Sequence, residues 1–262
     1  VVAAHKELKY ADEPEQPGHG CGNNNLGVGA AGAALLLKDA IQSGRVKGTV
    51  RFYGCPAEET LVGKVFMVRD GAFKDVDCAM TWHSHAYNGA WGACYTCMNS
   101  VKFHFHGVTA HAGGDPHNGR SALDAVELTD VGANYLREHV TTDVRIHYTI
   151  TEGGTAPNIV PDNATVWYYV RAPKRETVDE VYDRLVKVAE GAAHMTETKL
   201  EIEFMGGCYQ TLNNGVLVDL IHDCMVETPQ EAWTAEELEF AQKLDEARPD
   251  QYAAAIAGYG EP

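Results

Sequence analysis

The chain has 262 residues, enough for one large domain or two smaller ones, and its 45% of hydrophobic residues excludes a disordered protein. Its 37 acidic and 21 basic residues give a formal net charge of −16, which argues against nucleic acid and an anionic membrane as partners. No apolar run is long enough to span a membrane, and seven scattered cysteines favour a reducing compartment, so we expect a cytoplasmic protein.

The first hundred residues predict a layer in which strands and helices alternate. Residues 26–41 are apolar and rich in alanine, which favours a buried helix, and residues 49–53 favour a strand. A second helix should follow Glu58 and Glu59 and end at Gly71, before another buried strand at 78–82. Strand, helix and strand in this order indicate a parallel α/β layer.

The pattern changes near residue 98. Strands are expected at 101–106, 144–151, 164–171 and 200–204, and helices at 120–139 and from a capping box of Thr177 and Glu180 to residue 189. This β-α-β-β-α-β order is that of a ferredoxin-like unit. Its first strand alternates as an edge strand or a half-exposed strand does, and an exposed edge pairs readily with its copy in a dimer. Two further helices are expected at 216–226 and 231–248.

We therefore predict an α/β protein whose catalytic α/β domain is split by an insertion. The catalytic domain would comprise residues 1–97 and 209–262, and the inserted ferredoxin-like (βαββαβ) domain residues 98–208.

Three polar clusters lie at strand ends or helix starts, where α/β folds place active sites. Cys21 is either a metal-binding thiolate between two glycines or a small buried hydrophobe. Glu58 and Glu59 are either a general base beside a metal ligand or a solvated first helical turn. His83 is either a ligand or a hydrogen-bonded neighbour of the next layer. Together, thiolate, carboxylate and imidazole suit zinc or manganese.

Two other motifs are weaker. The G-x-G-x-x-G pattern from Gly27 to Gly32 lies inside a predicted helix, so close helix packing explains it better than dinucleotide binding. The C-x-x-C pattern of Cys94 and Cys97 lacks the two further ligands that a structural zinc site needs.

Within the predicted insertion, three residues have both a functional and a structural interpretation. Asn158 and Arg171 would bind a substrate carboxylate, and His111 would donate to a developing oxyanion. Turn chemistry and a surface charge would equally account for them.

Six motifs, in order along the chain, resemble those of the aminoacylase/carboxypeptidase-like metallopeptidase family, in its amidohydrolase branch with a Cys-Gly-His metal motif. The motifs are GHGCGxN from Gly18, PAEET from Pro56, TWH from Thr81, AHAG from Ala110, GRSALDA from Gly119 and APNIVP from Ala156. The resemblance implies a hydrolase with two metal ions, zinc or manganese, and an inserted lid domain that dimerises.

By the same resemblance, specific residues take specific roles. Cys21, Glu59 and His83 would be metal ligands, and Glu58 the general base and proton shuttle. His111 would reach the partner subunit's site as an oxyanion donor, with Asn158 and Arg171 near the substrate carboxylate.

Two departures from the family pattern stand out. Asn23 occupies the position of a family histidine ligand, and an amide oxygen is a weak ligand for zinc or manganese. The resemblance also implies further segments before Val1 and after Pro262, the second with a final histidine ligand.

The expected function is metal-dependent hydrolysis of the amide bond of N-acyl or N-aroyl amino acids, with p-aminobenzoyl-glutamate as substrate. The expected assembly is a homodimer through the lid or a hetero-oligomer with a homologous subunit. The alternatives are a dipeptidase, carboxypeptidase or aminoacylase of the same family, and a catalytically impaired scaffold subunit, which Asn23 would explain.

Overall fold

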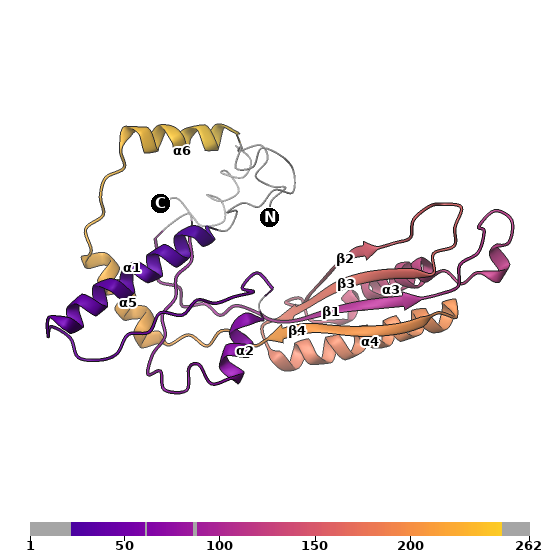
Figure 1. Ribbon diagram of the computed structural model, residues 1–262, viewed down its shortest axis with the longest axis horizontal. Helices are drawn as coiled ribbons and strands as arrows, with labels where there is room; N and C mark the ends of the chain where they lie inside the picture. Colours follow the sequence, from indigo (N-terminus) through magenta and orange to yellow (C-terminus); the bar gives the residue numbers. More distant parts are fainter. Residues whose placement is uncertain (1–21, 61, 86–87, 248–262) are drawn as a thin grey trace. The chain divides into compact units, whose positions relative to one another are not determined.

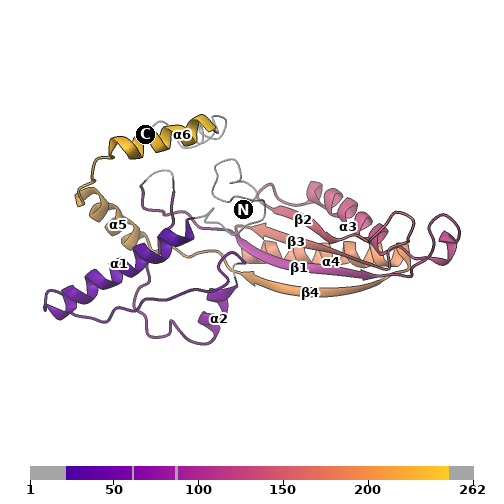
Figure 2. The same ribbon diagram turned by 45° about the horizontal axis from the view of Figure 1, so that its top comes forward.

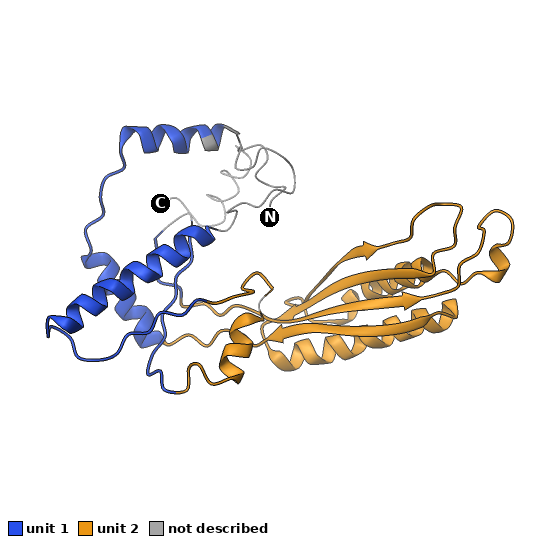
Figure 3. Ribbon diagram, in the orientation of Figure 1, with its two compact units in different colours: residues 1–54, 75–91, 215–262 blue, residues 55–74, 92–214 orange. Residues whose placement is uncertain are grey.

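The computed structural model describes residues 22–60, 62–85 and 88–247 and divides the chain into two compact units. Unit 1 comprises Val1–Gly54, Asp75–Trp91 and Gly215–Pro262, and unit 2 comprises Cys55–Lys74 and Gly92–Asn214 (Figure 3). The predicted domain boundaries at 97/98 and 208/209 stay a prediction.

Unit 2 contains a four-stranded antiparallel sheet with the order β2-β3-β1-β4 (Figure 1). The strands are β1 (Cys97–His106), β2 (Arg145–Glu152), β3 (Asn163–Ala172) and β4 (Lys199–Cys208). Helices α3 (Ala122–Leu136) and α4 (Arg175–Thr196) pack on one face of the sheet, as Figure 2 shows. Short 3-10 turns lie at Pro116–Asn118 and Arg137–His139. The β-α-β-β-α-β order predicted for the insertion is confirmed.

Buried and more exposed side chains alternate along β1 and β3, so one face of this sheet is buried and the other is not. Val101, Phe103 and Phe105 are fully buried against α3 and α4, together with alternate residues of β3. We call the uncovered side the open face. Its central strands carry Lys102, His104 and His106 from β1, and Trp167, Tyr169 and Arg171 from β3.

Of the two interpretations that the alternation of the first strand allowed, the edge strand is wrong and the half-exposed strand is confirmed. β1 hydrogen-bonds to β3 on one side and to β4 on the other, so the edges are β2 and β4. The alternation of β1 has a different cause: helices cover one face of the sheet and leave the other open.

The capping box predicted from Thr177 and Glu180 is also wrong, because the N-cap of α4 is Lys174, three residues before Thr177. Arg175, its first residue, forms an ion pair with Asp179 one turn later. The Arg175 guanidinium also donates to the carbonyl oxygens of Met98 and Cys208, at 3.2 and 3.4 Å. These contacts fix the start of the helix to the paired ends of β1 and β4.

In unit 1 the described elements are the helices α1 (Asn23–Gln42), α5 (Gly215–Glu227) and α6 (Ala235–Ala247). The G-x-G-x-x-G pattern lies within α1, as predicted. A Cβ on Gly29 would lie 2.7 Å from Cζ2 of Trp82, whose Nε1–H donates to the Leu26 carbonyl at 3.2 Å. Close packing against Trp82 therefore explains the central glycine of the pattern.

The two strands predicted at 49–53 and 78–82 do not form in the described part of unit 1, although the α/β class of the chain is confirmed. A strand requires a neighbour that accepts and donates ladder hydrogen bonds, and these segments pair with none of the described residues. Phe52 and Met80, expected to be buried there, are 54% and 63% exposed.

Three further findings concern helices and cysteines. α2 (Gly63–Arg69) begins four residues after Glu59, and it ends before Gly71, whose φ of 85° terminates it as predicted. None of the described helices is both long and apolar enough to cross a membrane. Five of the described cysteines, Cys78, Cys94, Cys97, Cys208 and Cys224, form no disulfide bond.

Candidate active site

Glu58 and Glu59 lie in a turn ahead of α2, in unit 2. Ala57, immediately before them, has a φ of 51°, a conformation that costs energy for any residue with a Cβ. The Thr60 hydroxyl donates to the Ala57 carbonyl at 3.0 Å and closes the turn. Backbone strain of this kind is concentrated at functional sites, and both Glu58 and Glu59 are exposed to solvent.

The same turn is anchored to the four-stranded sheet of unit 2. Gly206 on β4 has a φ of 151°, and a Cβ at this position would collide with Val62. Gly206 pairs with Ser100, which in turn pairs with Tyr169 on β3, two residues before Arg171. Unit 2 therefore holds the carboxylate turn at the end of the sheet where Arg171 lies.

His83 lies in unit 1, and its tautomer is fixed by the backbone. Nδ1 donates to the Ser84 carbonyl at 2.8 Å, so Nε2 of the neutral ring carries the lone pair that a metal requires. A Cβ on Gly22 would lie 2.6 Å from the Ser84 hydroxyl. The residue after Cys21 is thus in contact with the residue after His83, whereas Cys21 itself lies outside the described residues.

The expected metal ligands are distributed over both units. Glu59 belongs to unit 2 and His83 to unit 1, and the described residues contain no cluster of three or more His, Cys, Asp or Glu side chains suited to a metal ion. The donor set of thiolate, carboxylate and imidazole nevertheless suits zinc or manganese chemically. Asn23, at the position of a family ligand, is the first residue of α1.

His111 lies in the loop between β1 and α3. The backbone N–H groups of Gly113 and Gly114 donate to its Nδ1, at 3.2 and 3.0 Å. Nδ1 is therefore an acceptor, and the proton of the neutral ring is on Nε2. Because this side chain is exposed, it presents an N–H donor of the kind that stabilises an oxyanion.

Asn158 is adjacent to this loop through the backbone. The Ala112 N–H donates to the Asn158 carbonyl at 2.9 Å, and His111 forms an isolated bridge with Ile159. The structure thus brings together two of the predicted site residues, His111 and Asn158, at the end of the sheet where β1 ends and β3 begins.

Arg171 lies at the opposite end of β3. It lies eight positions after Asn163, the first residue of the strand, which corresponds to about 26 Å of extended chain. The structure therefore does not place Asn158 and Arg171 of one chain around the same small carboxylate.

The Arg171 guanidinium has an unused donor. Its Nε is buried, and none of the described residues accepts a hydrogen bond from it. The guanidinium lies over the Tyr169 ring, 5.3 Å from the centroid. Burial lowers the pKa of the neighbouring His147, and the charge of Arg171 adds to this effect. A buried donor without an acceptor is what a carboxylate ligand would satisfy.

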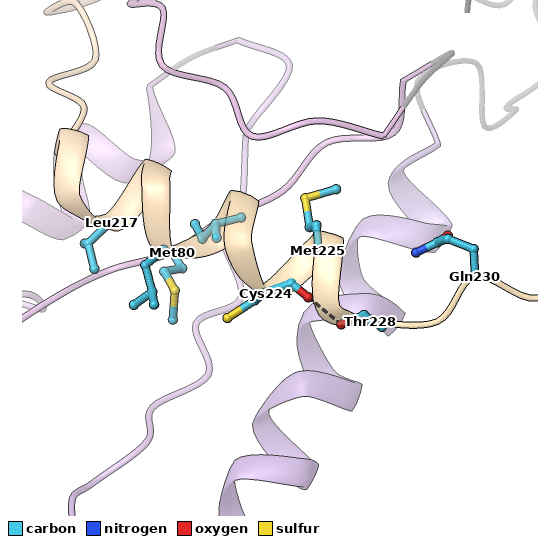
Figure 4. Close-up of a pocket in the computed structure, with 8 residues that line it drawn as sticks. Met80, Leu217, Cys224, Met225, Thr228 and Gln230 are labelled. Carbon is cyan, nitrogen blue, oxygen red and sulfur yellow. Dashed lines mark hydrogen bonds between the residues drawn. The ribbon is translucent and has the colours of Figure 1, made fainter.

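An apolar groove in unit 1 lies elsewhere, along α5 and Met80 (Figure 4). The side chains that line it are mainly aliphatic and sulfur-containing, among them Leu217, Cys224 and Met225. Its polar lining includes Thr228, whose hydroxyl donates to the Cys224 carbonyl at 2.6 Å. The groove contains none of the residues predicted to carry chemistry.

Sequence reasoning did not identify the neighbours of Arg171 on the open face. Tyr169 and Trp167 precede it on the same face of β3, and His147 lies opposite Tyr169 on β2. The sequence could have indicated these neighbours, because side chains alternate between the two faces of a strand and residues 167, 169 and 171 therefore share one face.

Comparison with known proteins identifies the class. Residues 98–196 match the family model described as the peptidase dimerisation domain (M20_dimer), a segment that contains β1, α3, β2, β3 and α4. The chain belongs to the M20 peptidases, the family that its six motifs indicated. Peptidases of this family are generally metal-dependent.

Two relatives bear the names of hydrolytic enzymes. One of the subunits of p-aminobenzoyl-glutamate hydrolase from Escherichia coli (strain K12) is 45% identical over 232 residues, 88% of this chain and 48% of that protein. Xaa-Arg dipeptidase of Mus musculus is 31% identical over 188 residues, 71% of this chain and 43% of that protein. The chain spans about half the length of the curated relatives it matches.

A crystal structure of a candidate aminohydrolase from methicillin resistant Staphylococcus aureus shares the fold. It superposes with a TM-score of 0.50 at 17% identity, over 64% of this chain and 47% of that one.

Proposed function

We propose that this chain contributes to the active site of a metal-dependent amidohydrolase that cleaves the amide bond of N-aroyl or N-acyl amino acids, with p-aminobenzoyl-glutamate as substrate. The observation that carries the proposal is the state of His111, whose Nε2–H is a donor because two backbone N–H groups occupy Nδ1. The 45% identity to a hydrolase of that name supports the choice of substrate.

In this proposal Cys21, Glu59 and His83 hold the metal, and we infer zinc or manganese, with two ions in the intact protein. When bound, the metal would polarise the scissile carbonyl and make water more acidic. The strained turn after Ala57 presents Glu58, which takes a proton from the attacking water and delivers it to the leaving amine. The unused Nε–H of Arg171 binds the substrate carboxylate.

Because the two ends of β3 are far apart, we assign His111 and Arg171 of one chain to two different sites. A small amide cannot contact both His111 and Arg171 of one chain across about 26 Å of strand. We therefore infer that His111 and Asn158 act in the site of a partner subunit, while Glu58 and Arg171 serve their own. The match of residues 98–196 to a peptidase dimerisation domain supports this arrangement.

We propose that residues 98–208 are the lid through which the protein forms a homodimer or pairs with a homologous subunit. The thiols of Cys78, Cys94, Cys97, Cys208 and Cys224, which form no disulfide bond, support a reducing, cytoplasmic location. Analytical ultracentrifugation of the intact protein tests the assembly, since a monomer would leave His111 without a partner site.

Glu58→Gln in the intact protein tests the proposed chemistry. The variant should lose turnover of p-aminobenzoyl-glutamate by about 100- to 10,000-fold, because it removes the group that transfers the proton. Its metal content should equal that of the wild type. Glu138→Gln, an exposed carboxylate elsewhere in unit 2, is the matched control and should stay active. A fully active Glu58→Gln variant would show that the role of Glu58 is wrong.

The similarity to a dipeptidase favours a second candidate function, hydrolysis of dipeptides. A panel of p-aminobenzoyl-glutamate, N-acetyl amino acids and dipeptides, compared by kcat/KM, decides between the two.

Asn23 favours a third candidate, a catalytically impaired scaffold subunit. Fewer than one metal ion per chain, unchanged in Asn23→His, would identify the scaffold.

A further inference from the structure

The residues preceding Arg171 on the open face form a row of aromatic rings. Trp167, Tyr169 and Arg171 alternate along β3, so their side chains leave the same face at intervals of about 6.6 Å. Tyr169 lies opposite Ser100 on β1 and opposite His147 on β2, so it stands at the centre of this part of the face.

The two rings are held in place by their neighbours. The Trp167 Nε1–H donates to the Ser100 hydroxyl at 2.8 Å. The Trp167 and Tyr169 rings meet edge to face, with centroids 5.5 Å apart and an interplanar angle of 88°. The His147 ring also meets Tyr169 edge to face, with centroids 6.1 Å apart and an interplanar angle of 81°. Rings fixed in this way lose little conformational entropy when a ligand binds.

A cation lies beside each ring of the aromatic row: Arg171 follows Tyr169 on β3, and Lys102 lies opposite Trp167 on β1. The Arg171 guanidinium lies 5.3 Å from the Tyr169 centroid, and the Lys102 ammonium lies 5.5 Å from the Trp167 centroid. Lys102 has a carboxylate partner in Glu203 at 3.9 Å, whereas the described residues offer no hydrogen-bond acceptor to Nε of Arg171. Of the two cations, Arg171 is therefore the one that we expect to bind an anionic ligand.

This spacing fits one class of ligand. In an N-aroyl amino acid the amide separates the aromatic ring from the carboxylate by about 6 Å, as standard bond lengths give. We propose that Tyr169 and Trp167 receive the aromatic ring of an N-aroyl amino acid whose carboxylate binds Arg171, so that the site selects aroyl over small acyl groups. This inference rests on the proposed function, because it deepens the choice of substrate within the same site.

Hydrolysis-resistant ligands separate ring recognition from catalysis. N-Benzenesulfonyl-glutamate and N-methanesulfonyl-glutamate carry the same charges and differ in the ring, and a sulfonamide replaces the scissile amide in both. Isothermal titration calorimetry of the intact protein gives the ratio of their dissociation constants. The wild type should bind the benzenesulfonyl ligand more tightly, and Trp167→Leu should reduce this preference by about 2- to 12-fold.

Three further variants distinguish recognition from loss of structure. Trp167→Phe keeps a ring and should keep most of the preference, whereas Tyr169→Leu should reduce it. Tyr135→Leu removes a 69% exposed ring from α3, on the other face of the sheet, and should leave the preference unchanged. Equal affinities of the wild type for both ligands, or a preference unaffected by Trp167→Leu and Tyr169→Leu, would overturn the inference.

Turnover of p-aminobenzoyl-glutamate by the same wild-type protein tests the proposed function separately. A ring preference without turnover supports ring recognition and overturns the reaction alone. Turnover with equal affinities for the two sulfonamides overturns the aromatic site alone.

Discussion

The backbone N–H of Gly114 donates a hydrogen bond to Nδ1 of His111, with 3.0 Å between the two nitrogens. Gly113 donates to the same atom at 3.2 Å. Two peptide groups thus determine which imidazole nitrogen carries the proton, a task that a carboxylate or carbonyl performs for many catalytic histidines. The arrangement suits a ring that donates from Nε2.

Substitution of His111 tests this donor role. His111→Ala should lower kcat for p-aminobenzoyl-glutamate by about 100- to 1,000-fold, the usual cost of removing one oxyanion donor. His111→Gln keeps an N–H at the end of a side chain of similar reach and should lose less. His117→Ala, an exposed histidine of the same loop, is the control, and steady-state kinetics is the measurement. Wild-type kcat in His111→Ala would contradict the role.

Mixing two inactive variants tests whether His111 acts in a partner's site. In a dimer of His111→Ala with Glu58→Gln, one site contains both an intact Glu58 and an intact His111 if His111 acts across the interface. Random exchange of subunits should then restore about a quarter of wild-type activity. If both residues act within one chain, no site is complete and the mixture stays inactive. Each variant alone, taken through the same exchange, is the control.

The inserted domain was more predictable from sequence than the remainder because its signals are local. Residues 98–196 contain both the alternating side chains of β1 and β3 and the apolar faces of α3 and α4. These elements pack against one another in a shared core. The strands expected at 49–53 and 78–82 depend on hydrogen bonds to other segments, and the described residues do not supply them.

For the candidate site, the sequence indicates which residues take part but not how they are arranged in space. The sequence identified Glu58, His111 and Arg171 as candidates, but residue types alone do not reveal spacing in three dimensions. The opposite positions of His111 and Arg171 follow from the direction of β3, and the tautomer of His111 follows from the folding of its loop. The edge prediction for β1 failed because alternation reports which face is covered and says nothing of position within a sheet.

Alanine substitutions along α1 test why the G-x-G-x-x-G pattern exists. A Cβ on Gly29 would lie 2.7 Å from the Trp82 ring, whereas at Gly27 and Gly32 no described atom beyond the neighbouring backbone lies within 4 Å. Gly29→Ala should therefore lower the free energy of unfolding. Gly27→Ala and Gly32→Ala should each raise it by about 1 kcal/mol through helix propensity. Urea denaturation followed by tryptophan fluorescence measures both effects, and similar changes at all three positions would exclude the packing explanation.

The carboxylate of Asp130 on α3 predicts a dependence of stability on pH. Asp130 is only 6% exposed and accepts a hydrogen bond from the Tyr168 hydroxyl. Burial raises the pKa of Asp130 from 3.8 to about 6, more than the Tyr168 hydrogen bond lowers it. Because the folded state favours the protonated acid, the stabilising contribution is complete below pH 3.8 and is lost as the pH rises towards 6.

Asp130→Asn removes this titration and keeps an acceptor for Tyr168. Between pH 4 and 7 the free energy of unfolding of the wild type should fall relative to that of the variant by about 3 kcal/mol, the free energy equivalent to the shift in pKa. Urea denaturation at several pH values measures the difference. Asp143→Asn, at an exposed position, should follow the wild type. Parallel curves for the wild type and Asp130→Asn would mean that folding does not raise the pKa of Asp130, because only a group with a shifted pKa loses stabilisation between pH 4 and 7.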